Sequence, residues 1–278
     1  MLKTLLGRLT RSPTVAIPEE LWESTLAELP FVARLTGDER LRLRALASQL
    51  IADKQMSAAG DLELTAAMQV NIAIQACLPV LNLGLDWYRG WTSIVVYPDE
   101  FLVPRSIVDD DGVVHEYIEP ITGEAWDGGP LLLSWEDAQR TVTDAGAAYS
   151  VVIHEFVHKI DLLNGEADGL PPFSGELHGG LGEQRWLSVL DDTFDRFLAE
   201  LELIESELPD GIDPDGPQAD PYYSHLPFDP YAAQDEAEFF AVSSEAFFVE
   251  PARLQRAFPD WYALLAEFFR QDPLRGAK

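Results

Sequence analysis

The chain has 278 residues, of which 47% are hydrophobic, so it can bury a sizeable core as one large domain or as a catalytic domain with a smaller companion. Its 19 basic residues against 48 acidic ones give a net charge of −29, which repels nucleic-acid phosphates and anionic membrane surfaces. We therefore expect a soluble protein that binds neither nucleic acid nor membrane directly, and we interpret the acidity as a solvated surface.

The N-terminal part of the chain lacks the features of a secreted protein. Residues 1–18 have no continuous apolar run and no cleavage site, so we expect a loosely attached arm rather than a signal peptide. The single cysteine, Cys77, excludes an internal disulfide, and its apolar neighbours predict a buried thiol. The longest apolar stretch, at residues 77–85, is interrupted and too short to span a bilayer. We expect a cytoplasmic location.

Helical spacing of apolar residues dominates residues 19–85. Two or three helices are predicted over residues 19–53, with the turn that begins at Thr36 placed to cap one of them. A further apolar helix is predicted over residues 61–76. We assign residues 19–85 to a helical portion that packs on a catalytic domain spanning residues 86–278.

The pattern changes to short β-branched or alternating segments after residue 85. Residues 92–98, 113–118 and 131–133 are each bounded by Gly, Pro or Asp, which is typical of strands. We predict a small mixed sheet of three or four strands, followed by a short helix capped by Ser134. The fold class expected for the whole chain is α+β.

The segment at residues 151–161 contains the pattern H-E-x-x-H. Apolar residues recur at three- and four-residue spacing through it, which predicts a helix. On a helix, His154 and His158 lie one turn apart on the same face and can share one Zn²⁺. Glu155 lies beside that face, where its carboxylate can take a proton from a water acidified by the metal. We predict a zinc peptidase site, with a chance match in an ordinary amphipathic helix as the alternative.

The chain beyond this helix alternates between irregular segments and helices. A loop rich in glycine and proline is predicted at residues 164–182, and we interpret its His178 as solvated or, alternatively, as a substrate contact. An acidic, proline-containing segment at residues 208–230 lacks periodicity and is expected at the surface. Helices are predicted at residues 186–204, 239–247 and 260–271.

Two histidines do not complete a catalytic zinc site, which generally has three protein ligands. The metzincin pattern requires a third histidine six residues after His158, but that position is Asn164, which excludes the metzincin class. Asp161 lies three residues after His158, and we expect it to orient an imidazole or to contact the helix end rather than to bind the metal.

A glutamate from the segment at residues 235–245 is the other candidate for the third ligand. Glu238 and Glu245 are seven residues apart and share one helical face, so one could bind zinc while the other braces a histidine. Glu236 points about 200° away from Glu238 at roughly 100° per residue. Spacing alone leaves both Glu238 and Glu245 open as the ligand.

Three segments together resemble the Mlc titration factor A family of bacterial zinc peptidases. They are HEFVHKID at residues 154–161, the stretch from Cys77 to Trp87, and the pattern Y-A-A-x-D-x-A-E-x-F-A-V-x-S-E at residues 231–245. The resemblance extends over most of the chain, from about residue 20 to Leu274. These motifs in combination are more specific than H-E-x-x-H alone.

The resemblance implies a zincin-like catalytic domain of the gluzincin group, similar to the catalytic domain of anthrax lethal factor, with one zinc ion per chain. It places the third ligand at Glu238, beside His154 and His158. It also gives Tyr231, seven residues before that glutamate, the role of stabilising the oxyanion; a tyrosine packed at a helix start is the alternative. Glu155 then acts as general base and as proton donor to the leaving amine, on a peptide substrate and with aminopeptidase activity on short peptides.

Members of this family also bind the glucose-responsive repressor Mlc, which provides a second hypothesis. On that hypothesis the protein sequesters a transcriptional repressor, and its zinc site is structural or regulatory. A metal-free relic is the third alternative. For the peptidase hypothesis, analogy with gluzincins predicts that residues 131–133 form an edge strand that pairs with an extended substrate. The chain departs from the family in lacking a proline at Glu236 and in its enlarged acidic segment.

Overall fold

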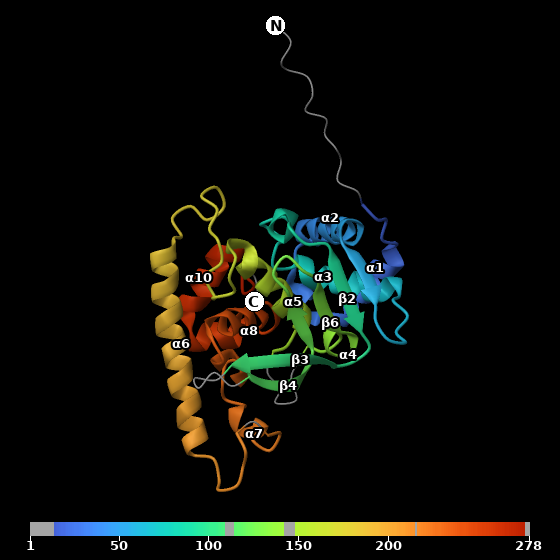
Figure 1. The fold of residues 1–278 in the computed structure, drawn as a ribbon. Helices are drawn as coiled ribbons and strands as arrows, with labels where there is room; N and C mark the ends of the chain where they lie inside the picture. The colour runs from blue at the N-terminus through green and yellow to red at the C-terminus, as the bar shows by residue number, and fades with distance from the viewer. Residues whose placement is uncertain (1–13, 109–113, 142–147, 215, 276–278) are drawn as a thin grey trace.

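The computed structural model describes residues 14–108, 114–141, 148–214 and 216–275. Most of the expected arm at residues 1–18 lies outside the described residues. Figure 1 shows the N-terminal helices on one side, the strands and helix α5 in the middle, and the C-terminal helices on the other side, with the long helix α6 along the outer surface. Helix α5, which carries the H-E-x-x-H pattern, therefore lies between helices from the N-terminal part and helices from the C-terminal part of the chain.

The N-terminal portion is helical, as predicted. Helices α1 (Glu19–Glu28) and α2 (Gly37–Asp53) are separated by the 3₁₀ helix η1 (Pro30–Arg34), and α3 (Ala66–Cys77) follows. The predicted cap at Thr36 is confirmed, because its side chain accepts a hydrogen bond from a backbone N–H of the first turn of α2. Most of α3 is buried, since its residues are apolar on nearly every face.

The central sheet is small and mixed, as predicted. It contains β1 (Gln55–Ala58), β2 (Ser93–Tyr97), β6 (Leu131–Ser134) and β5 (Gly123–Ala125), in the order β1-β2-β6-β5. β1 and β6 are parallel to β2, and β5 is antiparallel to β6. Strand β1 was not predicted, because its sequence QMSA carries little β-branched or alternating signal. The pairing of β1 with β2 joins residues from the two portions of the chain.

A separate two-stranded antiparallel sheet is formed by β3 (Phe101–Val108) and β4 (Val114–Ile121). The strand predicted at residues 113–118 corresponds to β4, but it pairs with β3 and does not join the central sheet; Val113 lies outside the described residues.

The prediction that residues 131–133 form an edge strand is wrong. Strand β6 lies between β2 and β5 and is buried along its whole length. A short, continuously apolar run is typical of an internal strand covered on both faces, which explains the difference. The edge strands of the sheet are β1 and β5.

The remaining elements form the helical layer around the site. Helices α4 (Trp135–Ala138) and α5 (Val151–Asp161) follow the sheet, and the predicted cap at Ser134 is confirmed. The later elements are η3 (Leu162–Asn164), α6 (Glu183–Ser206), α7 (Asp220–Tyr223), η4 (Pro230–Ala233), α8 (Glu236–Val249), α9 (Pro251–Ala257) and α10 (Pro259–Phe269).

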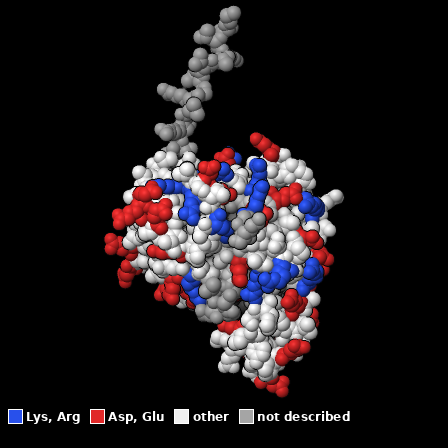
Figure 2. Space-filling model, turned by 180° about the vertical axis from the view of Figure 1, so that it is seen from behind, with Lys and Arg blue, Asp and Glu red and all other residues white. Residues whose placement is uncertain are grey.

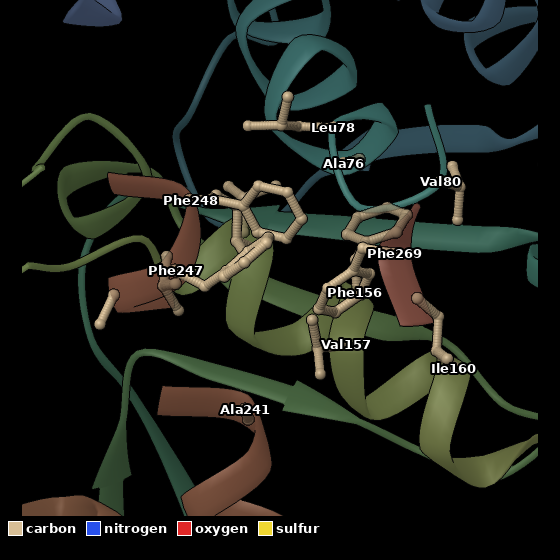
Figure 3. Packing of buried hydrophobic residues seen from close by; sticks show 14 of the residues in the cluster. Ala76, Leu78, Val80, Phe156, Val157, Ile160, Ala241, Phe247, Phe248 and Phe269 are labelled. Atoms are coloured by element: carbon tan, nitrogen blue, oxygen red, sulfur yellow. The ribbon is translucent and has the colours of Figure 1, made fainter. Parts of the chain in front are cut away.

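The core holds α5 between the N-terminal and C-terminal helices. Figure 3 shows Phe156 and Ile160 of α5 in the same cluster as side chains that follow α3 and others from the C-terminal helices. Phe156 is fully buried and makes edge-to-face contacts with Tyr88, in η2 (Leu85–Tyr88), and with Trp91. Burial of an aromatic side chain of this size stabilises a fold by roughly 1.5–3 kcal/mol. Burial of the apolar face of α5 in this core thus determines where the His154 and His158 side chains on the other face of the helix point.

The surface carries acidic side chains with Lys and Arg among them. On the face shown in Figure 2, blue side chains lie near the middle and red ones are spread around them, so the negative charge is not gathered in one patch there. Every helix in the described part of the chain is too short or too polar to cross a bilayer. The predicted burial of Cys77 is confirmed.

Candidate metal centre

Helix α5 brings the two histidines together. Its first turn is capped by Ser150, whose hydroxyl accepts a hydrogen bond from the backbone N–H of Ile153 at 3.1 Å. His154 and His158 lie one turn apart, and their Nε2 atoms are 3.0 Å from each other. Each side chain is 12% exposed, so both rings are largely shielded but still open to solvent on one side.

Helix α8 brings Glu238 to the same point. Asp235 caps α8 by accepting the backbone N–H of Glu238 at 2.9 Å, which places Glu238 in the first turn. The Glu238 oxygens lie 3.1 Å from Nε2 of His154 and 3.4 Å from Nε2 of His158. The candidate ligand atoms of the three residues all lie within 4.8 Å of one another. The cluster is therefore compatible with a metal ion.

The spacing of the cluster suits a small tetrahedral ion. Zinc bonds to nitrogen and carboxylate oxygen are about 2.0–2.2 Å long, so two ligands of a tetrahedral zinc lie about 3.3 Å apart. The three shortest separations between His154, His158 and Glu238 are 3.0, 3.1 and 3.4 Å. The donor set and its dimensions are therefore compatible with such an ion, with one oxygen of Glu238 nearer to His154 and the other nearer to His158.

Glu245 lies on the other side of His154 and does not join the cluster. Its Oε1 is 2.9 Å from Nδ1 of His154, and its Oε2 accepts the backbone N–H of Ser150 at 2.5 Å. The Nδ1–H of His154 can therefore donate to Glu245, which leaves Nε2 unprotonated and directed at Glu238. The spacing between the two glutamates left their roles open, and the structure separates them.

The electrostatics of the cluster favour a positive charge. Burial lowers the pKa of His154, but its hydrogen bonds to Glu238 and Glu245 outweigh burial and raise that pKa well above its ordinary value. Burial raises the pKa of Glu238, but its bonds to the two imidazoles lower it below the ordinary range. A divalent cation at the same position would neutralise the Glu238 carboxylate.

Glu155 is held beside this cluster in a confined space. Its side chain is buried, and one carboxylate oxygen has no hydrogen-bond partner within the described residues. Burial raises the pKa of Glu155 to about 7, although the nearby imidazoles oppose this shift. Gly123 of β5 provides the space, because a Cβ at that position would lie 2.7 Å from Cγ of Glu155. A carboxylate with this pKa is suited to exchange protons near neutral pH.

A cavity of about 320 Å³ adjoins Glu155 and His154. Its wall includes Thr122 and Gly123 at the start of β5 and Tyr231 of η4. The cavity therefore extends from the candidate metal centre along the exposed edge of the sheet.

Tyr231 lies at the mouth of this cavity. Its ring centroid is 6.1 Å from that of His154, and its side chain is 46% exposed. Asp229 caps η4 by accepting the backbone N–H of Tyr231 at 2.9 Å, which fixes the backbone of this segment. The tyrosine is therefore near the centre without being packed into the core.

Asp161 is buried at the end of α5 and is not one of the three residues of the cluster. Its Oδ2 accepts the backbone N–H of Gly169 at 2.8 Å, and burial raises its pKa to about 7. The carbonyl of Gly169 in turn accepts Nε1–H of Trp186 at 2.7 Å. A Cβ at Gly169, where φ is +75°, would lie 2.5 Å from the carbonyl oxygen of Glu236. Gly169 therefore connects the loop at residues 164–182 to α5, α6 and α8.

The interpretation of His178 as a solvated residue is wrong. His178 is buried, its Nδ1 accepts the backbone N–H of Ser174 at 3.0 Å, and its Nε2 lies 3.1 Å from the carbonyl oxygen of Phe268. Its ring also stacks on Phe268 and meets the edge of Trp87. The histidine attaches the loop to α10, because a glycine-rich loop needs a side chain that can satisfy its backbone.

Comparison with known proteins assigns the chain to a family. A sequence model of the glucose-regulated metallopeptidases M90 matches residues 6–270, which is most of the chain. The chain belongs to the M90 family. The M90 match and the cluster of His154, His158 and Glu238 agree on a metal-binding peptidase scaffold.

Similar M90 proteins carry the name Mlc titration factor A. The chain is 34% identical to that of Pectobacterium atrosepticum over 260 residues, which are 93% of this chain and 89% of the relative. It is also 34% identical to that of Salmonella arizonae over 254 residues, which are 91% of each chain. These similarities confirm the resemblance inferred from the sequence motifs.

Sequence reasoning missed several residues that support the centre of this M90 protein. Gly123 gives no signal until β5 is known to lie against Glu155. Lys159 was interpreted as part of the helix only, yet it is buried, and its Nζ donates to the carbonyl oxygens of Trp126 and Gly129. These bonds attach the turn between β5 and β6 to α5. Only its place two residues before the helix end, on the same helix as the histidines, pointed to Lys159.

Proposed function

We propose that the chain is a zinc-dependent peptidase of the gluzincin type in which His154, His158 and Glu238 hold one Zn²⁺. The observation that carries this proposal is the convergence of two Nε2 atoms 3.0 Å apart with the Glu238 carboxylate, whose two oxygens lie 3.1 and 3.4 Å from them, which is compatible with a zinc site of three protein ligands. When bound, zinc acidifies water and polarises a peptide carbonyl. All other steps are carried out by side chains of the chain.

Glu155 is the proton-transfer group in this proposal. One oxygen of its buried carboxylate has no hydrogen-bond partner among the residues that the structure describes, and the residue lines the cavity beside His154. It accepts the proton that water loses as it attacks the peptide carbonyl, and it donates that proton to the leaving amine. A pKa raised to about 7 by burial suits both directions of transfer.

Tyr231 and strand β5 are proposed to bind the substrate. Tyr231, which is 46% exposed and lines the cavity, is placed to donate a hydrogen bond from its hydroxyl to the developing oxyanion of a substrate bound there. Strand β5 is an edge strand of the central sheet, and its first residue lines the same cavity. An extended peptide backbone can therefore pair with β5 beside Glu155, with short peptides and aminopeptidase cleavage as the expected substrate class and reaction.

Replacement of Glu155 by Gln tests the peptidase proposal. We expect Glu155→Gln to reduce hydrolysis of chromogenic peptides by at least about 1,000-fold, with unchanged zinc content by elemental analysis. The matched control is Glu200→Gln, the same change on the exposed face of α6, which should keep full activity. Full activity in Glu155→Gln would disprove the assigned mechanism.

We also propose that the protein binds a transcriptional repressor in the cytoplasm. The names of the relatives carry this second proposal, since proteins 34% identical over about nine tenths of the chain are called titration factors of Mlc. The same name favours a regulatory role more directly than it favours peptide hydrolysis. The two functions are compatible, because a metal centre 12–18% exposed occupies a small part of the surface.

Binding to a purified Mlc-type repressor from the same organism tests the second proposal. We expect a complex in size-exclusion chromatography and calorimetry, and we expect Glu155→Gln to bind as tightly as the unmodified chain. Absence of a complex at micromolar concentrations would contradict repressor binding while leaving the peptidase proposal intact.

A further inference from the structure

A chain of buried polar side chains runs from helix α3 toward the metal centre. Gln75 is fully buried and Asn71 is 3% exposed, although the other buried residues of this helix are apolar. A buried amide without hydrogen bonds costs about 1–3 kcal/mol, so these side chains need partners. The partners they have lead to Glu245.

The orientation of Gln75 is fixed by three hydrogen bonds. Its Nε2 donates to Oδ1 of Asn71 at 2.7 Å and to the carbonyl oxygen of Ala138 at 2.9 Å. Both amide hydrogens are then used, and Oε1 is left as an acceptor. The hydroxyl of Ser150 donates to this Oε1 at 2.8 Å.

Ser150 passes this orientation on to the metal centre. Its hydroxyl hydrogen is directed at Gln75, so its lone pairs accept the backbone N–H of Ile153 and cap α5. Its own backbone N–H donates to Oε2 of Glu245, whose Oε1 receives Nδ1–H of His154. The direction of each hydrogen bond in the sequence Gln75, Ser150, Glu245, His154 is thereby determined.

We propose that Gln75 and Ser150 are positioning residues that fix Glu245 and, through it, the Nδ1–H hydrogen bond and the ring orientation of His154. Helix α3 of the N-terminal portion is then part of the support of the metal centre. The proposal rests on the proposed function only in taking His154 as a ligand. It gives the buried polar residues of an apolar helix a role that core packing does not require.

The test combines metal affinity with a measurement on the metal-free protein. Gln75→Leu should weaken zinc binding about 10-fold in chelator competition, at the low end of the effect of partners behind a metal ligand. It should also change the His154 Nδ1–H signal in long-range ¹H–¹⁵N spectra of the metal-free chain. Ser150→Ala should have both effects. Ser150→Thr keeps the hydroxyl and should leave both the zinc affinity and the His154 signal unchanged.

A second variant of α3 separates positioning from general destabilisation. Ile72 is fully buried on the same helix but takes no part in the polar chain, so Ile72→Val should lower the melting temperature without changing zinc affinity. If Gln75→Leu lowers the melting temperature while zinc affinity and the His154 signal stay unchanged, the proposal is wrong. A chain that binds zinc but cuts no peptide would contradict the proposed peptidase and leave this inference standing.

Discussion

Helices α5 and α8 contribute to the candidate metal centre in different ways. On α5, the two imidazoles are four residues apart, and the helix repeat alone brings their Nε2 atoms to 3.0 Å. On α8, Glu238 and Glu245 also share a face, but each meets a different nitrogen of His154. Local periodicity therefore determines which residues of one helix act together, while packing of the two helices determines what each carboxylate does.

The largest expected effect separates the two glutamates of α8. Glu238→Ala removes a proposed ligand, and we expect zinc binding to be lost in equilibrium dialysis. Glu245→Gln keeps a hydrogen-bond acceptor near Nδ1 of His154, and we expect a loss of roughly 10- to 100-fold in zinc affinity, typical of a group that orients a ligand. Loss of zinc in Glu245→Gln together with retention of zinc in Glu238→Ala would contradict the roles of Glu238 as ligand and Glu245 as the group that orients His154.

The next effect concerns Tyr231, which belongs to neither helix. Tyr231→Phe keeps the ring that lies 6.1 Å from the His154 ring and removes only the hydroxyl. We expect kcat for peptide hydrolysis to fall roughly 100-fold, the effect of losing one oxyanion donor, with little change in KM or zinc content. An unchanged kcat would show that Tyr231 is only a wall of the cavity.

A smaller effect is expected where β5 meets α5. Gly123→Ala introduces a Cβ 2.7 Å from Cγ of Glu155, so the carboxylate has to move. We expect kcat to fall about 10- to 100-fold through misplacement of the base, with zinc affinity preserved. Gly37→Ala is the matched control, since no atom lies within 4 Å of the added carbon. Equal kcat values for the two variants would contradict the proposed role of Glu155.

The smallest expected effect is a change in KM that distinguishes two lysines over the Trp91 ring, the buried Lys159 and the half-buried Lys54. Lys159 donates to the carbonyls of Trp126 and Gly129 beside β5, whereas Lys54 donates to those of Tyr88 and Trp91. Each change to Met leaves carbonyl groups without a donor and should destabilise the chain by about 1–3 kcal/mol. Only Lys159→Met should also raise KM a few-fold, because it alone releases the turn of the edge strand. A rise in KM for Lys54→Met would contradict this.

Much of the centre was predictable because its signals are local. The H-E-x-x-H spacing, the caps at Thr36 and Ser134 and the helical periods each depend on residues within a few positions of one another. The separation of Glu238 from Glu245 depends on how α8 lies against α5, some eighty to ninety residues earlier in the chain. Motif resemblance named Glu238, which the structure places with His154 and His158, whereas periodicity left Glu238 and Glu245 open.

The errors have a shared physical cause. Strand β1 has a sequence of low β-propensity and is held in place by β2, and residues 131–133 became an internal strand because β5 pairs with them. His178 was expected in solvent because its loop is rich in glycine, but the side chain is buried against α10. In each case the deciding partner is another segment, distant in sequence for β1 and His178 and close but itself not predicted for residues 131–133, and composition contains no information about it.

Gly169 has a consequence for how a peptide enters the molecule. By composition, the stretch from residue 164 to 182 looks like a movable cover, yet it is held at Gly169 by Asp161 and Trp186 and at His178 by Phe268. A cover anchored at two positions cannot swing away during turnover without breaking buried bonds. In the proposed peptidase, we therefore expect peptides to enter and products to leave between β5 and η4, where the cavity lies, while residues 164–182 stay in place.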